Sequence, residues 1–120
     1  MEFNRVKISS LMTTKLKTLK TRTGLNPNIL CRLALCYSLE HESYNDLLPL
    51  TVEDGQEFNR YTLFGQYDLF FISLIKEKCV KEGLDAEKDF MKQLKFHINN
   101  GINILNTRVK SLSDLTNLIE

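Results

Sequence analysis

The sequence lacks the long apolar runs that membrane proteins need. No stretch of about 18 uninterrupted apolar residues occurs, so we expect no membrane-spanning helix. The first ten residues, MEFNRVKISS, also lack the apolar segment of a secretory signal, which predicts a cytoplasmic location. A chain of 120 residues can bury a core, and we expect it to form one domain, residues 1–120.

The motifs of the common enzyme classes are missing as well. The sequence has no G-x-G-x-x-G, no phosphate-binding GK[ST] and no H-E-x-x-H. Of its two histidines, His41 lies between Glu40 and Glu42, but adjacent helical residues point in different directions and do not favour a shared metal. His97 lies beside the apolar stripe of its helix, where a structural role is expected. We therefore predict no enzymatic activity, no cofactor and no metal.

Cysteine is scarce and its spacing is not that of a metal or redox site. Cys31, Cys36 and Cys79 are odd in number and form neither a zinc knuckle nor a C-x-x-C pair. The favoured interpretation is three reduced thiols that act as small hydrophobic residues. The alternative is a sulfur-relay protein with a reactive thiol, for which the position of Cys31 near a helix N-terminus and beside Arg32 is the only argument.

Charge is distributed unevenly along the chain. Up to Gly24 the only acidic residue is Glu2, against six cations, so this segment carries +5 and the remainder carries −4. The six cations are Arg5, Lys7, Lys15, Lys17, Lys20 and Arg22. A basic segment on an acidic body is typical of a protein with one face turned to a polyanion, although a solvated helix face is the alternative.

The first 40 residues predict a strand followed by two helices. In FNRVKI, residues 3–8, apolar and basic residues alternate as in a half-buried strand. Ser9 or Ser10 can cap a helix over residues 11–23, and Gly24 supplies its left-handed end. Asn26 and Pro27 then begin an almost wholly apolar helix that extends to about Glu40.

The rest of the chain predicts further helices after a long loop over residues 41–57, which contains Pro49 and the turn pair Asp54-Gly55. A short extended segment should follow and end at Gly65; its letters EFNR repeat residues 2–5, too short a match to indicate duplication. Helices are expected over residues 66–81, from Asp85 to Asn99, after a break at Gly101, and after Ser111 or Ser113.

These elements predict a mainly α fold: a compact helical domain with one or two short strands and a ribbon-helix-helix-like N-terminal part. In the ribbon-helix-helix pattern the strand pairs with that of a second chain, and the two-stranded ribbon fits the major groove of DNA. Arg5 and Lys7 would then point outward to the bases. A transcription regulator of this type is the alternative function, but the chain beyond His41 is far longer than that module requires.

Three segments resemble the DndE family of DNA sulfur modification proteins. They are TRTGLNPNILCRLALCYSLE, EFNRYTLFGQYD and HINNGI, and the resemblance spans nearly the whole chain. It implies a non-catalytic DNA-binding component of the bacterial system that replaces a phosphate oxygen of DNA by sulfur. It also implies a compact helical homo-oligomer, a tetramer, with a preference for nicked double-stranded DNA. The implied protein partners are the other phosphorothioation proteins DndC and DndD.

The resemblance and the charge pattern together predict where DNA binds. The candidate DNA-binding residues are Arg5, Lys7, Lys15, Lys17, Lys20 and Arg22. Contacts of Lys and Arg with phosphates release condensed counterions, so binding should depend on salt and largely ignore base sequence. The apolar helix that begins at Pro27, together with FISLI, offers more apolar surface than a small domain covers alone, which predicts an oligomer.

Overall fold

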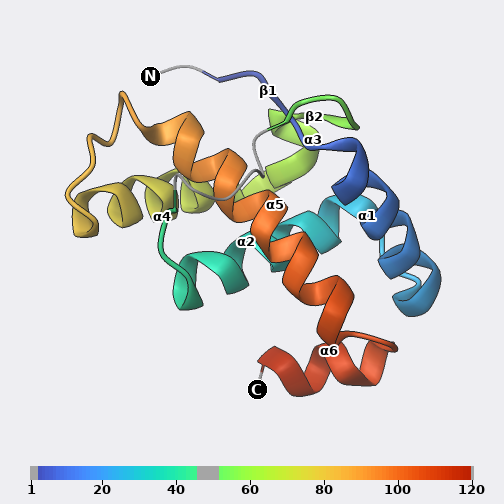
Figure 1. Ribbon diagram of the computed structural model, residues 1–120. Coiled ribbons are helices and arrows are strands. Elements are labelled where there is room, and N and C mark those ends of the chain that lie inside the picture. Colours follow the sequence, from blue (N-terminus) through green and yellow to red (C-terminus); the bar gives the residue numbers. More distant parts are fainter. Residues whose placement is uncertain (1–2, 46–51, 120) are drawn as a thin grey trace.

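The computed structural model describes residues 3–45 and 52–119, which form six α-helices and a small two-stranded sheet at the upper edge of the molecule in Figure 1. In chain order the elements are β1 Arg5–Lys7, α1 Ser10–Thr23, α2 Pro27–His41, β2 Glu57–Asn59, α3 Arg60–Phe64, the short 3-10 helix η1 Gly65–Tyr67, α4 Asp68–Lys81, α5 Phe90–Arg108 and α6 Leu112–Ile119. The mainly α fold class is therefore confirmed. Pro49, part of the expected loop, lies outside the described residues.

The small sheet joins two segments that are far apart in the sequence. β1 and β2 are antiparallel, with Arg5 opposite Asn59 and Lys7 opposite Glu57. The central pair, Val6 and Phe58, is buried, whereas the four flanking side chains are exposed. In the ribbon-helix-helix pattern β1 would pair with a second chain, but in this structure it pairs with a strand of its own chain.

The start of α1 is fixed by side chains that satisfy its free amide groups. Ser9 is the N-cap, and its hydroxyl oxygen accepts a hydrogen bond from Met12 N at 3.1 Å. The Asp54 carboxylate accepts from Ser10 N at 2.7 Å, which attaches residues 54–56 to the same turn. Gly24 ends the helix with a φ of 75°, as the sequence predicted.

The core is organised around the crossing of α2 and α5, which lie across one another in Figure 1. Gly101 lies at this crossing: a Cβ atom placed there would be 2.1 Å from the Ala34 carbonyl oxygen and 2.9 Å from the Ala34 Cβ. The expected helix break at Gly101 is therefore wrong, because α5 continues from Phe90 to Arg108 without interruption. This glycine is needed for close packing and does not end the helix.

Two other expectations need correction. Only residues 57–59 of the expected extended segment form a strand, because the Asn59 side chain accepts from Tyr61 N at 2.9 Å and caps the short helix α3. The helix expected from Asp85 begins at Phe90; the Asp85 carboxylate does accept from Glu87 N and Lys88 N, but it closes a turn ahead of the helix.

Within the described part of the chain, no helix combines the length and the apolar character required to cross a bilayer.

Substitution of Gly101 by Ala tests the close approach of α2 and α5. In an isolated helix this change would stabilise by about 1 kcal/mol, because Ala is the better helix former. In this protein the added methyl group meets the Ala34 backbone, so we expect a loss of about 1–3 kcal/mol in the free energy of unfolding, measured by urea denaturation.

Thr107→Ala is the matched control, because Thr107 lies in the same helix with an exposed side chain. It should leave stability within about 0.5 kcal/mol of the parent protein. An unchanged or higher stability of the Gly101→Ala variant would show that α2 and α5 do not depend on this contact.

Candidate nucleic-acid interface

Two of the six predicted DNA-binding cations face the protein. The Lys15 ammonium group donates to Asn103 Oδ1 of α5. Arg22 Nη1 donates to the carbonyl oxygens of Asn106 at 2.9 Å and Val109 at 3.3 Å, at the C-terminal end of the same helix. Both cations therefore hold α1 against α5, and Arg22 also satisfies carbonyl groups that a helix end leaves without partners.

Lys17 and Lys20 project from the opposite side of α1. At 100° per residue, Lys17 is rotated about 200° from Lys15, whereas Lys20 lies three residues further along nearly the same line. Both side chains are exposed and take part in no ion pair or side-chain hydrogen bond within the described residues. The structure thus divides the four cations of α1 into two pairs with different surroundings.

The exposed side of α1 continues into the small sheet. Thr13 lies on the same line as Lys17 and Lys20, and its hydroxyl oxygen accepts from Gln56 N at 2.8 Å. Gln56 directly precedes Glu57, which is the partner of Lys7 in the sheet. Lys7 is exposed and, within the described residues, has no ion-pair partner. We call Lys7, Lys17 and Lys20 the basic flank.

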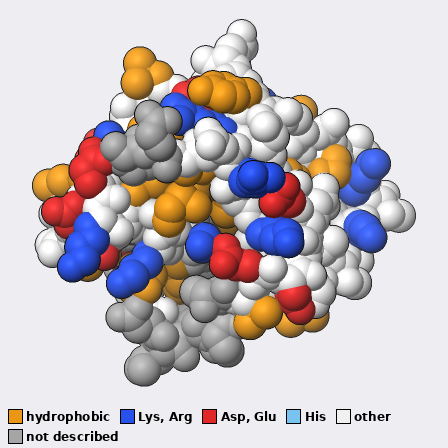
Figure 2. Space-filling view, turned by 90° about the horizontal axis from the view of Figure 1, so that it is seen from above, with side chains coloured by type: hydrophobic (Ala, Val, Ile, Leu, Met, Phe, Trp, Pro, Cys, Tyr) orange, Lys and Arg blue, Asp and Glu red, His pale blue; other side chains and the backbone are white. Residues whose placement is uncertain are grey.

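Arg5 differs from the basic flank because it forms an ion pair with Glu57. Its guanidinium lies 3.6 Å from a Glu57 carboxylate oxygen, with 70% of the Arg5 side chain and 45% of the Glu57 side chain exposed. An ion pair so open to solvent contributes little stability and can exchange for another partner. Figure 2 shows the face above β1 and β2, where basic and acidic side chains lie next to one another.

Two further arginines are held by interactions inside the fold. Arg32 donates to the carbonyl oxygens of Leu63 and Thr62 and thereby connects α2 to α3. Arg60 forms two hydrogen bonds of 2.8 Å with the Asp68 carboxylate and also lies over the Phe3 ring. The Arg60 contact lowers the pKa of Asp68 below its usual value. Neither arginine adds a free cation to the surface.

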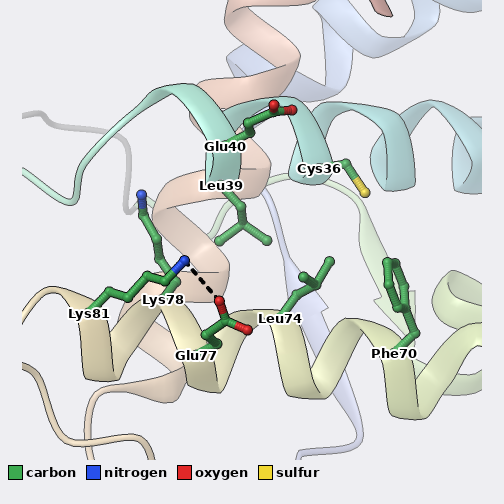
Figure 3. A pocket seen from close by; sticks show the side chains of 8 residues that line it. All are labelled: Cys36, Leu39, Glu40, Phe70, Leu74, Glu77, Lys78 and Lys81. Atoms are coloured by element: carbon green, nitrogen blue, oxygen red, sulfur yellow. Dashed lines mark ion pairs between the residues drawn. The ribbon is translucent and has the colours of Figure 1, made fainter.

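An apolar groove lies between α2 and α4 (Figure 3). It consists of two adjoining hollows of about 360 and 270 Å³ that share Cys36 and Phe70. At one end Lys81 forms an ion pair of 2.8 Å with Glu77. Apolar side chains of the groove remain open to solvent, with Phe70 54%, Tyr67 49% and Ile29 41% exposed. We call this feature the α2–α4 groove.

A buried serine and histidine pair resembles part of a catalytic site but is closed to substrates. Ser38 Oγ lies 2.7 Å from His97 Nδ1 and accepts a hydrogen bond from Asn100 Nδ2 at 3.1 Å. Neither Ser38 nor His97 has any exposed surface, so no substrate can reach the hydroxyl group. The expectation that His97 is structural fits this position. No sequence pattern pointed to Ser38, because the two residues are 59 positions apart.

The electrostatics of the buried groups do not favour nucleophilic chemistry. Burial lowers the pKa of His97 to about 4, with nearby Lys78 acting in the same direction, so its ring is neutral at pH 7. Burial also raises the pKa of Cys31, Cys36 and Cys79, and acidic neighbours raise those of the last two further. Arg32, which the sequence placed beside Cys31, is bonded to α3. Within the described ranges, no three His, Cys, Asp or Glu side chains are grouped as metal ligands.

Together, these features define a small mainly α protein with a two-stranded ribbon and exposed cations on β1 and α1. Residues 5–113 match the family model described as DNA sulphur modification protein DndE. The chain belongs to the DndE family. No curated protein matches it.

Two solved structures are similar over most of the chain. DndE from Escherichia coli B7A, described as involved in DNA phosphorothioation modification, is 29% identical with a TM-score of 0.67; the match covers 88% of this chain and 99% of that chain. A DndE mutant, described as involved in DNA phosphorothioation, is 26% identical with a TM-score of 0.63, and the match covers 86% and 99% of the two chains. Membership of this family places the protein in the phosphorothioation system.

The buried His97 predicts a loss of stability in mild acid. Its pKa is lowered in the folded protein, to about 4, from 6.5 when exposed, so between these values the unfolded chain binds the proton more readily. The stability that the neutral His97 contributes is fully present above pH 6.5. It is lost as the pH falls toward 4, by at most about 1.4 kcal/mol of unfolding free energy per pH unit. Urea denaturation between pH 7 and 5 measures this slope.

A His97→Gln variant separates this contribution from that of other groups. It should be less stable at pH 7 but should lose stability with falling pH less steeply than the parent. Equal slopes for the two proteins would show that His97 does not remain neutral in the folded state.

Proposed function

We propose that this protein is the non-catalytic, duplex-binding component of a DNA phosphorothioation system. It acts in the cytoplasm on double-stranded DNA, preferably nicked, alongside the other phosphorothioation proteins DndC and DndD. Family membership supports the system, and the basic flank supports the binding. Lys7, Lys17 and Lys20 are exposed and form no ion pair within the described part of the chain, and the contact of Thr13 with Gln56 brings α1 next to the ribbon that carries Lys7.

Such a line of ammonium groups suits a phosphate backbone. Lysine binds phosphate as a point charge and needs no fixed orientation, so the contacts carry affinity without reading bases. Rigid support of α1 increases the affinity that these contacts give, because less conformational freedom is lost on binding. Lys15 and Arg22 give that support from the opposite side of α1 by hydrogen bonds to α5. Four of the predicted cations thus contribute to one surface in two different ways.

The α2–α4 groove supports the proposal of an oligomer, as the tetramer implied by the family resemblance requires. A second copy that covers Ile29, Tyr67 and Phe70 would remove an exposed apolar surface from water. The residues that line the groove come from α2, η1 and α4, and none comes from α1 or β1. Oligomer formation through the groove would therefore leave the basic flank available to DNA.

The alternative of a sulfur relay has less support. A relay requires an accessible thiolate, but Cys31 and Cys79 are buried and all three thiols have a raised pKa. The buried Ser38 and His97 pair likewise offers no accessible nucleophile. These observations favour binding over catalysis.

Removal of Lys17 and Lys20 tests the basic flank directly. The Lys17→Ala, Lys20→Ala double variant should bind every duplex more weakly, to a similar extent for each sequence. The slope of log affinity against log salt should become shallower by about 0.9 for each phosphate that the variant no longer neutralises. Thermal stability should hardly change, because both side chains are exposed and Ala favours helix. Fluorescence anisotropy with labelled duplex over a series of salt concentrations measures the slope.

Two variants serve as controls. Lys88→Ala with Lys92→Ala removes the same charge from exposed positions outside the basic flank and should keep the parental slope. Arg22→Ala should instead reduce stability by about 1–3 kcal/mol, because the carbonyl groups of Asn106 in α5 and of Val109 just after it lose their donor. If the Lys17 and Lys20 variant binds as tightly and with the same salt dependence as the parent, the basic flank is only a solvated surface.

The proposed role of the α2–α4 groove in oligomer formation predicts a charge-sensitive interface. Phe70→Asp should give the monomer mass at micromolar concentration in light scattering, because an interface would have to bury the new carboxylate. Leu69→Asp is the control: Leu69 is 78% exposed on the same helix but does not line the groove, so this variant should remain oligomeric. A parent protein of monomer mass, or a Phe70→Asp variant with the parental mass, would contradict the interface.

A further inference from the structure

We propose that the β1–β2 ribbon reads base sequence, as an addition to the backbone binding of the proposed function on which this inference rests. The ribbon belongs to a single chain and exposes four polar side chains on one side. They are Arg5 and Lys7 from β1, and Glu57 and Asn59 from β2. The ligand is the major-groove edge of duplex DNA, which is wide enough to admit a two-stranded ribbon.

The four side chains form a compact two-by-two array. Arg5 is directly opposite Asn59, and Lys7 is directly opposite Glu57. Positions two residues apart on a strand are separated by about 6.6 Å, close to two base-pair steps of about 3.4 Å. The buried pair of Val6 and Phe58 fixes the sheet to the core, so the array is presented by a rigid support.

The chemistry of the array differs from that of the basic flank. Arginine and lysine donate to the O6 and N7 atoms of guanine, and a carboxylate accepts from the N4 amino group of cytosine. Lys7 and Glu57 therefore match the two halves of a G·C pair. Asn59 Oδ1 accepts from Tyr61 N, which leaves its Nδ2 to donate to a base edge. The exposed Glu57 carboxylate would repel phosphates, so it does not suit a surface that binds only phosphates.

Glu57 also gives the ribbon a means of rejecting DNA. Its carboxylate repels phosphates, and it pairs with Arg5 at 3.6 Å when no DNA is present. On a suitable duplex, Arg5 exchanges this solvent-exposed partner for a guanine, and Glu57 accepts from a cytosine. On an unsuitable duplex the carboxylate lacks a donor and binding is weaker. The ribbon therefore binds different DNA sequences with different affinities.

The surroundings of the ribbon leave space for the neighbouring backbone. A hollow of about 260 Å³ lies between β2 and the start of α2, and Glu57 is its only carboxylate-bearing residue. Uncharged polar side chains line most of it, namely Asn26, Asn28, Gln56, Asn59 and Thr62. The basic flank begins on the ribbon itself, at Lys7. A duplex seated on the ribbon therefore meets the basic flank as a continuous surface.

Selection from a pool of random duplexes, followed by sequencing, tests base reading by the parent protein. The parent should enrich a short pattern that contains a G·C pair. Arg5→Lys keeps the charge but loses the bidentate guanidinium donor. The preference for one base at one position should therefore fall roughly tenfold, while the slope of log affinity against log salt stays unchanged. Glu57→Gln should alter preference at a neighbouring position. Both side chains are exposed, so the fold should be retained, as circular dichroism can verify.

Lys20→Ala is the matched control and should weaken binding to all sequences equally without altering the enriched pattern. Binding by the parent without any base preference, or a pattern that neither Arg5→Lys nor Glu57→Gln changes, would overturn base reading and leave the proposed function standing. If the parent binds no duplex at all, the proposed function fails together with this inference.

Discussion

The close approach of α5 to α2 at Gly101 is the contact on which the remaining structure depends. Because the glycine hydrogen allows the α5 backbone to meet the Ala34 carbonyl group, the two longest helices pack directly against one another. Their crossing aligns Ser38 with His97 and Asn100 in a buried polar network. It also fixes α5 as the support for α1, through Asn99, Asn103 and Asn106.

This arrangement explains how the cation-rich helix α1 can pack against α5 and still expose cations to solvent. One side of α1 carries cations that donate to α5, and the other side carries cations that remain in solvent. The two-residue step from Lys15 to Lys17 crosses the helix, so a single run of basic residues serves both purposes. The same logic applies to the arginines, of which Arg32 and Arg60 connect helices and Arg5 remains on the surface. Function on this account depends on which cations the fold leaves without partners.

The sequence predicted local features well because they depend on neighbouring residues. The Ser9 cap, the left-handed Gly24 and the start of α2 after Asn26 all follow from chemistry within a few positions. It failed at Gly101, where a contact 67 positions away in the sequence decides the outcome and favours a continuous helix. It also failed to separate Lys17 from Arg22, because charge along the chain does not show which residues α5 will bind. The repeated letters EFNR gave no signal for the ribbon, because Arg5 alone of the first copy lies in β1 and it pairs with Asn59, which is not its equivalent in the second copy.

The central claim is that duplex DNA meets the basic flank and the ribbon, on the side of α1 turned away from α5. Nuclear magnetic resonance of the labelled protein during titration with a short nicked duplex tests this most directly. We expect salt-sensitive shift changes for Lys17 and Lys20 and for the four exposed ribbon residues, which include Lys7, with little change in the α2–α4 groove. Changes concentrated in the groove, with none on the basic flank, would contradict it.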